Sequence, residues 1–229
     1  MQHIVIVGNA GAARECYWIF QEMLQADSTL SERYMFKGFL AWKNYPGNLK
    51  DLTCHSLGEA TSYILSPDDR IVIGIGHPYL REEVFNYFKS KNALFFTLCH
   101  PLADINPTAK IGEANIFQRG SSVFCDAILG DANYLNGTVN LSHDASVGSF
   151  NFLGPLTLLL GNCTVGNKNS IAARCTILPG AKIGNNNIIA PNSVVYKGCG
   201  SNARMVGNPA LKIASYMPEA TLPCRNMQP

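Results

Sequence analysis

The amino-acid sequence predicts two parts of different architecture: a small α/β domain with a parallel sheet, then a coil of short β-strands. Two observations carry this prediction. Every sixth position from Ile105 to Val195 is apolar, sixteen in a row. In a chain that is 47% apolar, such a run has a chance probability on the order of one in 10⁵. Before this repeat, strand-like apolar runs alternate with helical patterns, which is typical of a parallel sheet with helices on it.

The first hundred residues should form this α/β domain. The pattern predicts strands at residues 3–8, 35–41, 70–75 and 94–98, and helices at 14–25, 57–63 and 79–89. Parallel sheets bind ligands at the carboxyl ends of their strands. We therefore expect a binding crevice at that edge of the sheet, made by Gly8, Asn9, Ala10, Gly11, Ala12, Gly74 and His77. A strand, turn and helix in this order suit an anion. However, G-x-x-G-x-A is neither a dinucleotide fingerprint nor a P-loop, so a purely structural turn is an equal alternative.

A second period of eighteen residues lies on the six-residue repeat. Glycine recurs at 112, 130, 148, 166 and 184, and asparagine recurs at 115, 133, 151, 169 and 187. Three hexads therefore make one coil with three flat sides, and the first residue of each hexad points inward. Because Gly and Asn tolerate positive φ, we expect them to form the corners. Residues 105–194 should make about five coils, and the small fifth residues of the hexads indicate a narrow prism.

Composition excludes several classes of function. The net charge is +2 without a Lys/Arg run, so neither nucleic acid nor an anionic membrane surface is an expected partner. No segment is long enough to span a bilayer, and the N-terminus lacks the pattern of a signal peptide. The eight cysteines are scattered, without C-x-x-C or zinc spacing. We expect no metal, reduced thiols and a cytoplasmic protein.

One histidine lies inside the repeat. His143 is the third residue of its hexad and is followed directly by Asp144. This position predicts a corner, where the ring projects outward. Histidine is the usual general base at neutral pH. From spacing alone, an exposed polar corner residue is the somewhat better explanation.

The hexapeptide pattern resembles the left-handed parallel β-helix of acyltransferases. The segments G-N-C-T-V-G-N-K-N-S-I (161–171) and V-G-N-P-A (206–210) resemble the sialic-acid O-acetyltransferase and bacillosamine N-acetyltransferase family. The resemblance implies an α/β domain over 1–100 that holds a nucleotide-sugar acceptor, a left-handed β-helix over 101–200 and a tail over 201–229. It also implies acetyl-CoA as co-substrate and a homotrimer in which acetyl-CoA lies between adjacent prisms.

Residue roles follow from the same resemblance. The family's catalytic pair falls on His143 and Asp144, and its oxyanion donor falls on Gly161. Its acetyl-CoA path falls on Phe152, Gly161, Asn162, Ala173 and Pro191. Three departures stand out: Phe152 replaces a histidine found in many relatives, Ala12 and Ala13 replace His-Gly, and Ala41 and Trp42 replace an Asp pair. Arg81 is a further candidate for acceptor contact, and Lys168 is one for the phosphates of coenzyme A.

The resulting expectation is an acetyl-CoA-dependent acetyltransferase that acts on the amino group of a nucleotide-linked sugar in bacterial surface polysaccharide biosynthesis. Sialic-acid-type O-acetylation and a non-catalytic β-helix binding module are the main alternatives. A zinc hydratase on the same fold is disfavoured, because catalytic zinc needs about three protein ligands and the repeat has one histidine. A nicotinamide oxidoreductase is weaker still, because no G-x-G-x-x-G follows the first strand.

Overall fold

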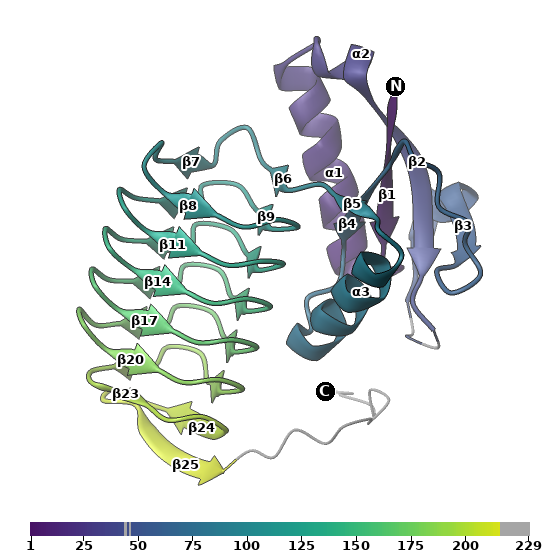
Figure 1. Cartoon of the computed structure of the whole chain (residues 1–229). Helices are drawn as coiled ribbons and strands as arrows, with labels where there is room; N and C mark the ends of the chain where they lie inside the picture. Colours follow the sequence, from purple (N-terminus) through teal and green to yellow (C-terminus); the bar gives the residue numbers. More distant parts are fainter. Residues whose placement is uncertain (44, 46, 216–229) are drawn as a thin grey trace.

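The computed structural model describes residues 1–43, 45 and 47–215 and has two parts (Figure 1). The first is a parallel five-stranded sheet with the order β3-β2-β1-β4-β5. Its strands are β1 (Gln2–Val7), β2 (Tyr34–Ala41), β3 (Ser56–Glu59), β4 (Asp69–Ile73) and β5 (Leu94–Phe95). β1 pairs with both β2 and β4 and is buried from Ile4 to Val7. The continuous apolar run of β1 thus fits the centre of a sheet covered on both faces.

The helices of this domain are α1 (Gly11–Ala26), α2 (Leu30–Arg33), the 3-10 helix η1 (Lys50–His55) and α3 (Pro78–Ser90). α1 buries Ala13, Cys16, Ile19 and Phe20, a three-to-four-residue spacing that places one apolar stripe against the sheet. None of the described helices is long and apolar enough to cross a membrane.

Two predicted elements of the α/β domain differ in the structure. The helix expected at 57–63 is wrong, because Ser56–Glu59 is strand β3 beside β2. Gly58 there has φ +87°, which no right-handed helix accommodates. The strand expected at 94–98 is split: Leu94–Phe95 ends the α/β sheet, whereas Leu98–Cys99 begins the second part.

The second part is the expected left-handed parallel β-helix, a stack of coils with three faces (Figure 1). Face 1 contains β6 (Leu98–Cys99), β9 (Ile116–Phe117), β12 (Tyr134–Leu135), β15 (Phe152–Leu153), β18 (Ser170–Ile171), β21 (Ile188–Ile189), β24 (Ala203–Val206) and β25 (Leu211–Ser215). Face 2 contains β7 (Asp104–Ile105), β10 (Ser122–Val123), β13 (Asn140–Leu141), β16 (Leu158–Leu159), β19 (Thr176–Ile177) and β22 (Val194–Val195). Face 3 contains β8 (Lys110–Ile111), β11 (Ile128–Leu129), β14 (Ser146–Val147), β17 (Thr164–Val165), β20 (Lys182–Ile183) and β23 (Gly198–Cys199).

The prism extends further at both ends than the predicted five coils of residues 105–194. β6 precedes the predicted start of the repeat, and β24 continues face 1 into the segment predicted as a tail. Residues 216–229 of that predicted tail, with Cys224, lie outside the described residues. The first residues of the hexads from Phe117 to Val195 form the buried core, together with small fifth residues such as Ala127 and Cys163.

The recurrent asparagines and glycines have roles other than the predicted one. Positive φ belongs to the fourth residue of the hexads, for example Ala132 (φ +50°) and Phe150 (φ +64°). The repeated asparagines follow these positions and are fully buried. Asn151 Oδ1, for instance, accepts the backbone N–H of Asn169 (2.8 Å) and its Nδ2 (3.0 Å). At the repeated glycines there is no room for a side chain: a Cβ atom on Gly130 would lie 2.8 Å from the Gly148 carbonyl carbon.

Arg81 of α3 joins the two parts. Its side chain is fully buried. The guanidinium donates to the Ile73 and Ile75 carbonyls in the α/β domain (2.8 and 2.7 Å) and to the Ala132 carbonyl in the prism (2.7 Å). Burial lowers the pKa of Arg81 to about 10. Arg81 is therefore a structural connection, and the expectation that it contacts an acceptor is wrong.

Candidate active site

His143 and Asp144 form a pair on the edge between faces 2 and 3. They lie in the corner between β13 and β14, and Asp144 has φ +58° at the turn. The corner brings Asp144 Oδ2 to 2.8 Å from His143 Nδ1, and the two side chains are 59% and 53% exposed. No described residue hydrogen-bonds to Nε2 of His143. The carboxylate therefore orients the ring and leaves the second nitrogen accessible.

Gly161 lies one coil further along the same edge, beneath the His143 ring. A Cβ atom at Gly161 would lie 2.6 Å from Cε1 and 2.7 Å from Nε2 of His143. The Asn162 N–H donates to the His143 carbonyl (3.2 Å), which ties the two corners together. Among the described residues none accepts the Gly161 N–H. A backbone amide without a partner, in a corner that contacts the candidate base, is the type of group that can stabilise an oxyanion.

Ala173 and Pro191 lie on a different edge. Both are third residues of hexads that follow face 1, so they stack on the edge between faces 1 and 2. The Asn192 N–H donates to the Ala173 carbonyl (3.0 Å) and connects their coils. Within one chain, face 2 separates these predicted acetyl-CoA contacts from His143.

Phe152 lies in a third place, on face 1 at the junction with the α/β domain. A Cβ atom at Gly76 would lie 3.3 Å from Cε2 of its ring. Tyr134 packs beside the ring, with centroids 5.6 Å apart. Phe152 thus contacts the turn after β4 and, in the same chain, lies on the face opposite the edge of His143.

The predicted crevice residues meet at the carboxyl ends of β1 and β4. Gly8 has φ +135°, and a Cβ atom there would lie 2.4 Å from the Gly74 carbonyl oxygen. This close approach explains the glycine at both turns. Ala10 precedes α1 without a side-chain cap, which leaves the first N–H groups of the helix for another acceptor.

The loop after β2 packs on the same turn. A Cβ atom at Gly47 would lie 2.2 Å from the Asn9 carbonyl oxygen, and Arg14 donates to the Asn48 carbonyl. Trp42, in one of the departing positions, is only 1% exposed and its Nε1 donates to Glu83 (3.4 Å). The side chain at this position therefore serves the core of the α/β domain.

His77 is the residue before α3 and has an exposed surface at the crevice. Desolvation by the neighbouring protein lowers the pKa of His77 below the ordinary histidine value. Its ring packs near Tyr79, at 5.9 Å between centroids. A neutral imidazole at this position has one ring nitrogen that donates a hydrogen bond and one that accepts a hydrogen bond.

The described part of the chain offers no metal cluster, and two of its buried thiols are unreactive. It contains no group of three His, Cys, Asp or Glu residues that could hold a metal ion. Burial raises the pKa of Cys16 to about 12 and that of Cys163 to about 11. These thiols are therefore poor nucleophiles at neutral pH.

Sequence reasoning missed one cavity, which lies between α3 and the edge that joins faces 3 and 1. Its lining includes Glu82, Asn167, Lys168 and Asn185. The sequence carries one signal for this cavity: each hexad that begins on face 3 has a polar third residue, so polar side chains line the edge between faces 3 and 1. Lys168, predicted as a candidate for coenzyme A phosphates, is held there by an ion pair with Glu82 (3.1 Å).

Comparison with known proteins gives the same architecture. The bacterial transferase hexapeptide (six repeats) family matches residues 162–197. Comparison with curated protein sequences found no significant match.

Several solved structures share the fold over nearly the whole chain. A mutant of perosamine N-acetyltransferase from Caulobacter crescentus, in complex with CoA and GDP-perosamine, has a TM-score of 0.81 and 21% identity, covering 94% of this chain and 98% of that one. The acetyltransferase domain of PglB from Neisseria gonorrhoeae, in complex with acetyl coenzyme A, has a TM-score of 0.78 and 18% identity, covering 93% and 99%. WeeI from Acinetobacter baumannii has a TM-score of 0.77 and 17% identity, covering 93% and 100%.

At these identities the likeness establishes the fold, and the family match establishes the repeat. The chain therefore contains hexapeptide repeats and shares the two-part fold of these structures.

Proposed function

We propose that the protein is an acetyl-CoA-dependent N-acetyltransferase for a nucleotide-linked amino sugar. The arrangement of His143, Asp144 and Gly161 carries the proposal: an imidazole oriented by a carboxylate, with an accessible Nε2, lies against the corner of Gly161, whose N–H has no partner among the described residues. Acyl transfer from a thioester needs both groups, a base for the nucleophile and a donor for the oxyanion.

The reaction follows from these positions. The amine nitrogen of the sugar attacks the thioester carbonyl, and Nε2 of His143 takes the proton that the amine loses. Asp144 stabilises the imidazolium that forms. The Gly161 N–H stabilises the negative charge on the carbonyl oxygen. When the carbon–sulfur bond breaks, the imidazolium returns the proton and coenzyme A leaves as the thiol.

The acceptor would bind at the carboxyl ends of β1 and β4. The first turn of α1, which begins at Gly11, offers free N–H groups to phosphate oxygens, and Gly8, Gly74 and His77 lie beside it. Support also comes from the fold relatives, since one was solved with GDP-perosamine and another with acetyl coenzyme A. We favour nitrogen over oxygen as the acceptor atom, because amine acylation needs only one base and a donor hydrogen bond.

Separation of the predicted site residues supports a homotrimer with shared sites. His143 and Gly161 occupy one edge of the prism, whereas Ala173 and Pro191 occupy another. Apolar side chains on or beside face 2, between these edges, are exposed in the single chain: Phe124, Leu156, Leu158 and Tyr196. Burying face 2 against neighbouring prisms would remove this surface from water. It would also bring one subunit's His143 edge toward the next subunit's Ala173 edge.

We propose a cytoplasmic location as well. The seven described cysteines are all free, and free thiols are usual in a reducing compartment.

Replacing His143 tests the proposal. In an assay of free-thiol release with acetyl-CoA and a panel of nucleotide-linked sugars, His143→Asn should lower kcat by about 10²–10⁴-fold. His55→Asn, which changes an exposed histidine of η1, is the control and should keep its turnover. Unchanged kcat in His143→Asn would remove the proposed base.

The same panel distinguishes the alternatives. Turnover with hydroxyl sugars but not with amino sugars would replace N-acetylation by O-acetylation. A protein that shows no binding of acetyl-CoA in calorimetry and no turnover on any sugar would be a non-catalytic module, for which Phe152, Ala12 and Ala13 are the supporting features.

A further inference from the structure

A cavity of about 280 Å³ lies between α3 and the edge that joins faces 3 and 1. Figure 1 shows α3 beside the turns of the β-helix. Glu82 comes from α3, whereas the other polar lining comes from successive coils. His143 lies on a different edge, so the proposed active site of the same chain does not include this cavity.

Three lining side chains form a ladder whose oxygens are already occupied. Ser149 Oγ accepts the Asp131 N–H (2.9 Å), Asn167 Oδ1 accepts the Ser149 N–H (2.7 Å), and Asn185 Oδ1 accepts the Asn167 N–H (2.7 Å). Because each amide oxygen is fixed on the backbone, each amide NH₂ is directed away from it. No described residue accepts from Nδ2 of Asn167 or Asn185. The coils thus present a preorganised column of hydrogen-bond donors.

A cation and two kinds of acceptor complete the lining. Lys168 Nζ lies 3.1 Å from Glu82 and 5.6 Å from the centre of the Tyr79 ring. Asn186 donates through Nδ2 to Asn202 (3.1 Å), while its buried Oδ1 has no partner among the described residues. Phe150 supplies an apolar wall.

From this inventory we infer that the cavity binds a small hydroxylated acid about the size of one sugar ring. A carboxylate or phosphate on the ligand accepts from the Asn167 and Asn185 amides and from Lys168. Hydroxyl groups of the ligand donate to Glu82. The volume suits a monosaccharide, because it lies just below the range of roughly 300–1,000 Å³ that is usual for pockets of drug-sized ligands. The inference does not depend on acetyl transfer.

Calorimetry with four probes tests this inference: glucuronate, glucose 6-phosphate, glucose and inorganic phosphate. We expect glucuronate or glucose 6-phosphate to bind at least tenfold more tightly than glucose and than inorganic phosphate. The stronger of the two acids identifies whether a carboxylate or a phosphate is the anchor. Equal affinity for glucose, or binding of none of the probes, would overturn the inference.

Two variants locate the binding. Asn167→Asp and Asn185→Asp keep the oxygen that accepts the backbone N–H but replace the free NH₂ by a negatively charged oxygen. The chain itself accepts aspartate in this ladder, since Asp131 Oδ1 accepts the Glu113 N–H (2.9 Å). Each variant should therefore fold with an unchanged unfolding temperature and bind the acid at least tenfold more weakly.

Asn106→Asp is the matched control, because Asn106 Oδ1 accepts from the Thr108 N–H (3.0 Å) in a surface turn outside the cavity. It should bind the acid as the unchanged protein does. If Asn167→Asp and Asn185→Asp also bind with unchanged affinity, the acid binds elsewhere and the cavity is not its site. Acetyl transfer measured on the same variants keeps this result separate from the proposed function.

Discussion

At the scale of single residues, the candidate base is positioned by short contacts along one edge. Asp144 bonds to Nδ1 of His143, and Gly161 leaves space for the ring because it has no side chain. The His143 ring therefore packs on the backbone of the next coil. Its position depends both on the hydrogen bond with Asp144 and on the lack of a side chain at Gly161.

A side chain at residue 161 should displace the ring. In Gly161→Ala the new Cβ would lie 2.6–2.7 Å from His143 Cε1 and Nε2, which forces the imidazole to move. We expect kcat to fall at least tenfold, because small misplacements of a catalytic group are costly. Steady-state kinetics measures this. Gly200→Ala, where a Cβ meets no atom within 4 Å, should retain full kcat, and equal rates in both variants would refute the positioning role of Gly161.

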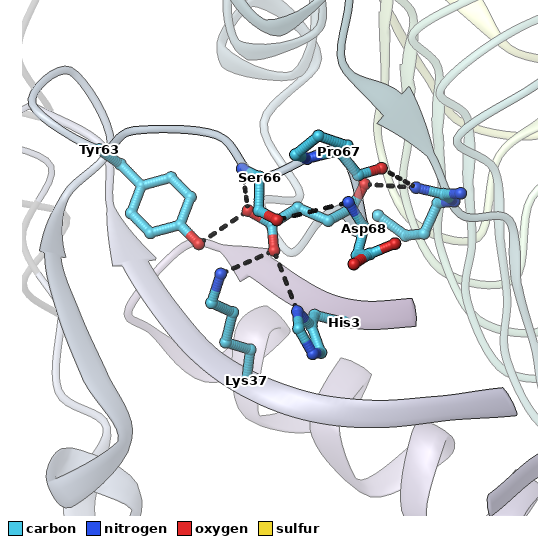
Figure 2. Close-up of polar contacts among 8 residues, drawn as sticks. His3, Lys37, Tyr63, Ser66, Pro67 and Asp68 are labelled. Atoms are coloured by element: carbon cyan, nitrogen blue, oxygen red, sulfur yellow. Dashed lines mark hydrogen bonds and ion pairs between the residues drawn. The ribbon is translucent and has the colours of Figure 1, made fainter. Parts of the chain in front are cut away.

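At the scale of elements, a buried carboxylate connects strands and loops at the amino-terminal end of the α/β sheet. Asp69 begins β4, and Lys37 of β2 lies 2.8 Å from its Oδ1. Tyr63 and the Ser66 N–H donate to Oδ2 (2.9 and 2.8 Å). Figure 2 shows Lys37, Tyr63, Ser66 and His3 converging on this carboxylate. The cluster lies at the end of the strands away from the crevice and so contributes to stability.

The pH dependence of the unfolding free energy should reveal how much this cluster contributes to stability. Burial alone raises the pKa of Asp69, but Lys37, the Ser66 N–H and Tyr63 hold it below the ordinary value of 3.8. The stabilisation is therefore complete above pH 3.8 and disappears as the pH falls further. Asp69→Asn should lower the free energy of unfolding by on the order of 1–3 kcal/mol at pH 7.

Urea unfolding at several pH values measures the difference between Asp69→Asn and the unchanged protein. That difference should shrink below pH 3.8, where the carboxyl group becomes neutral in both states. A difference that stays constant with pH would show that the charge of Asp69 does not contribute. Asp68→Asn changes an adjacent exposed carboxylate and serves as the control.

The asparagine ladder is the second element that can be tested. Asn151 donates to Asn133 and accepts from Asn169 inside the prism. Asn151→Ala leaves buried polar groups above and below without partners, so we expect a loss of about 3 kcal/mol of unfolding free energy. Chemical denaturation measures it. Thr164→Ala, on the exposed side of face 3, should change stability little, and similar values for both variants would refute the ladder's role.

At the scale of the whole molecule, the prism has one face covered by the α/β domain and one with exposed apolar side chains. Leu158→Glu places a charge on face 2 and should dissociate the proposed trimer, because a buried unpaired charge is costly. Ile128→Glu makes the same change on face 3, where Ile128 is 46% exposed, and should leave the assembly intact.

Light scattering gives the molar mass of both variants, and thiol release gives their activity. We expect Leu158→Glu to be monomeric and inactive, because the residues that form the site would no longer meet. A monomer with full activity would refute the shared site.

The sequence by itself determined the prism and the corner that holds His143. An unbroken six-residue apolar period admits one arrangement, because each first residue must be buried and each third residue then lies at a corner. The left-handed coil was implied by family resemblance. By contrast, the sequence does not predict the roles of Gly130 and Asn151. Their recurrence every eighteen residues shows that equivalent positions stack, but not that the glycines are closely packed and the asparagines form a ladder.

Only the tertiary structure decided how the two parts meet. The helical pattern that contains Arg81 indicates one buried face but not its partner, so the fully buried contact with Ala132 could not be foreseen. The same holds for Phe152, which a resemblance assigns to the acetyl-CoA path but which packs on Gly76. Periodicity shows which residues of one element are buried. It does not show which residues of another element cover them, because these contacts form only when two folded surfaces pack together.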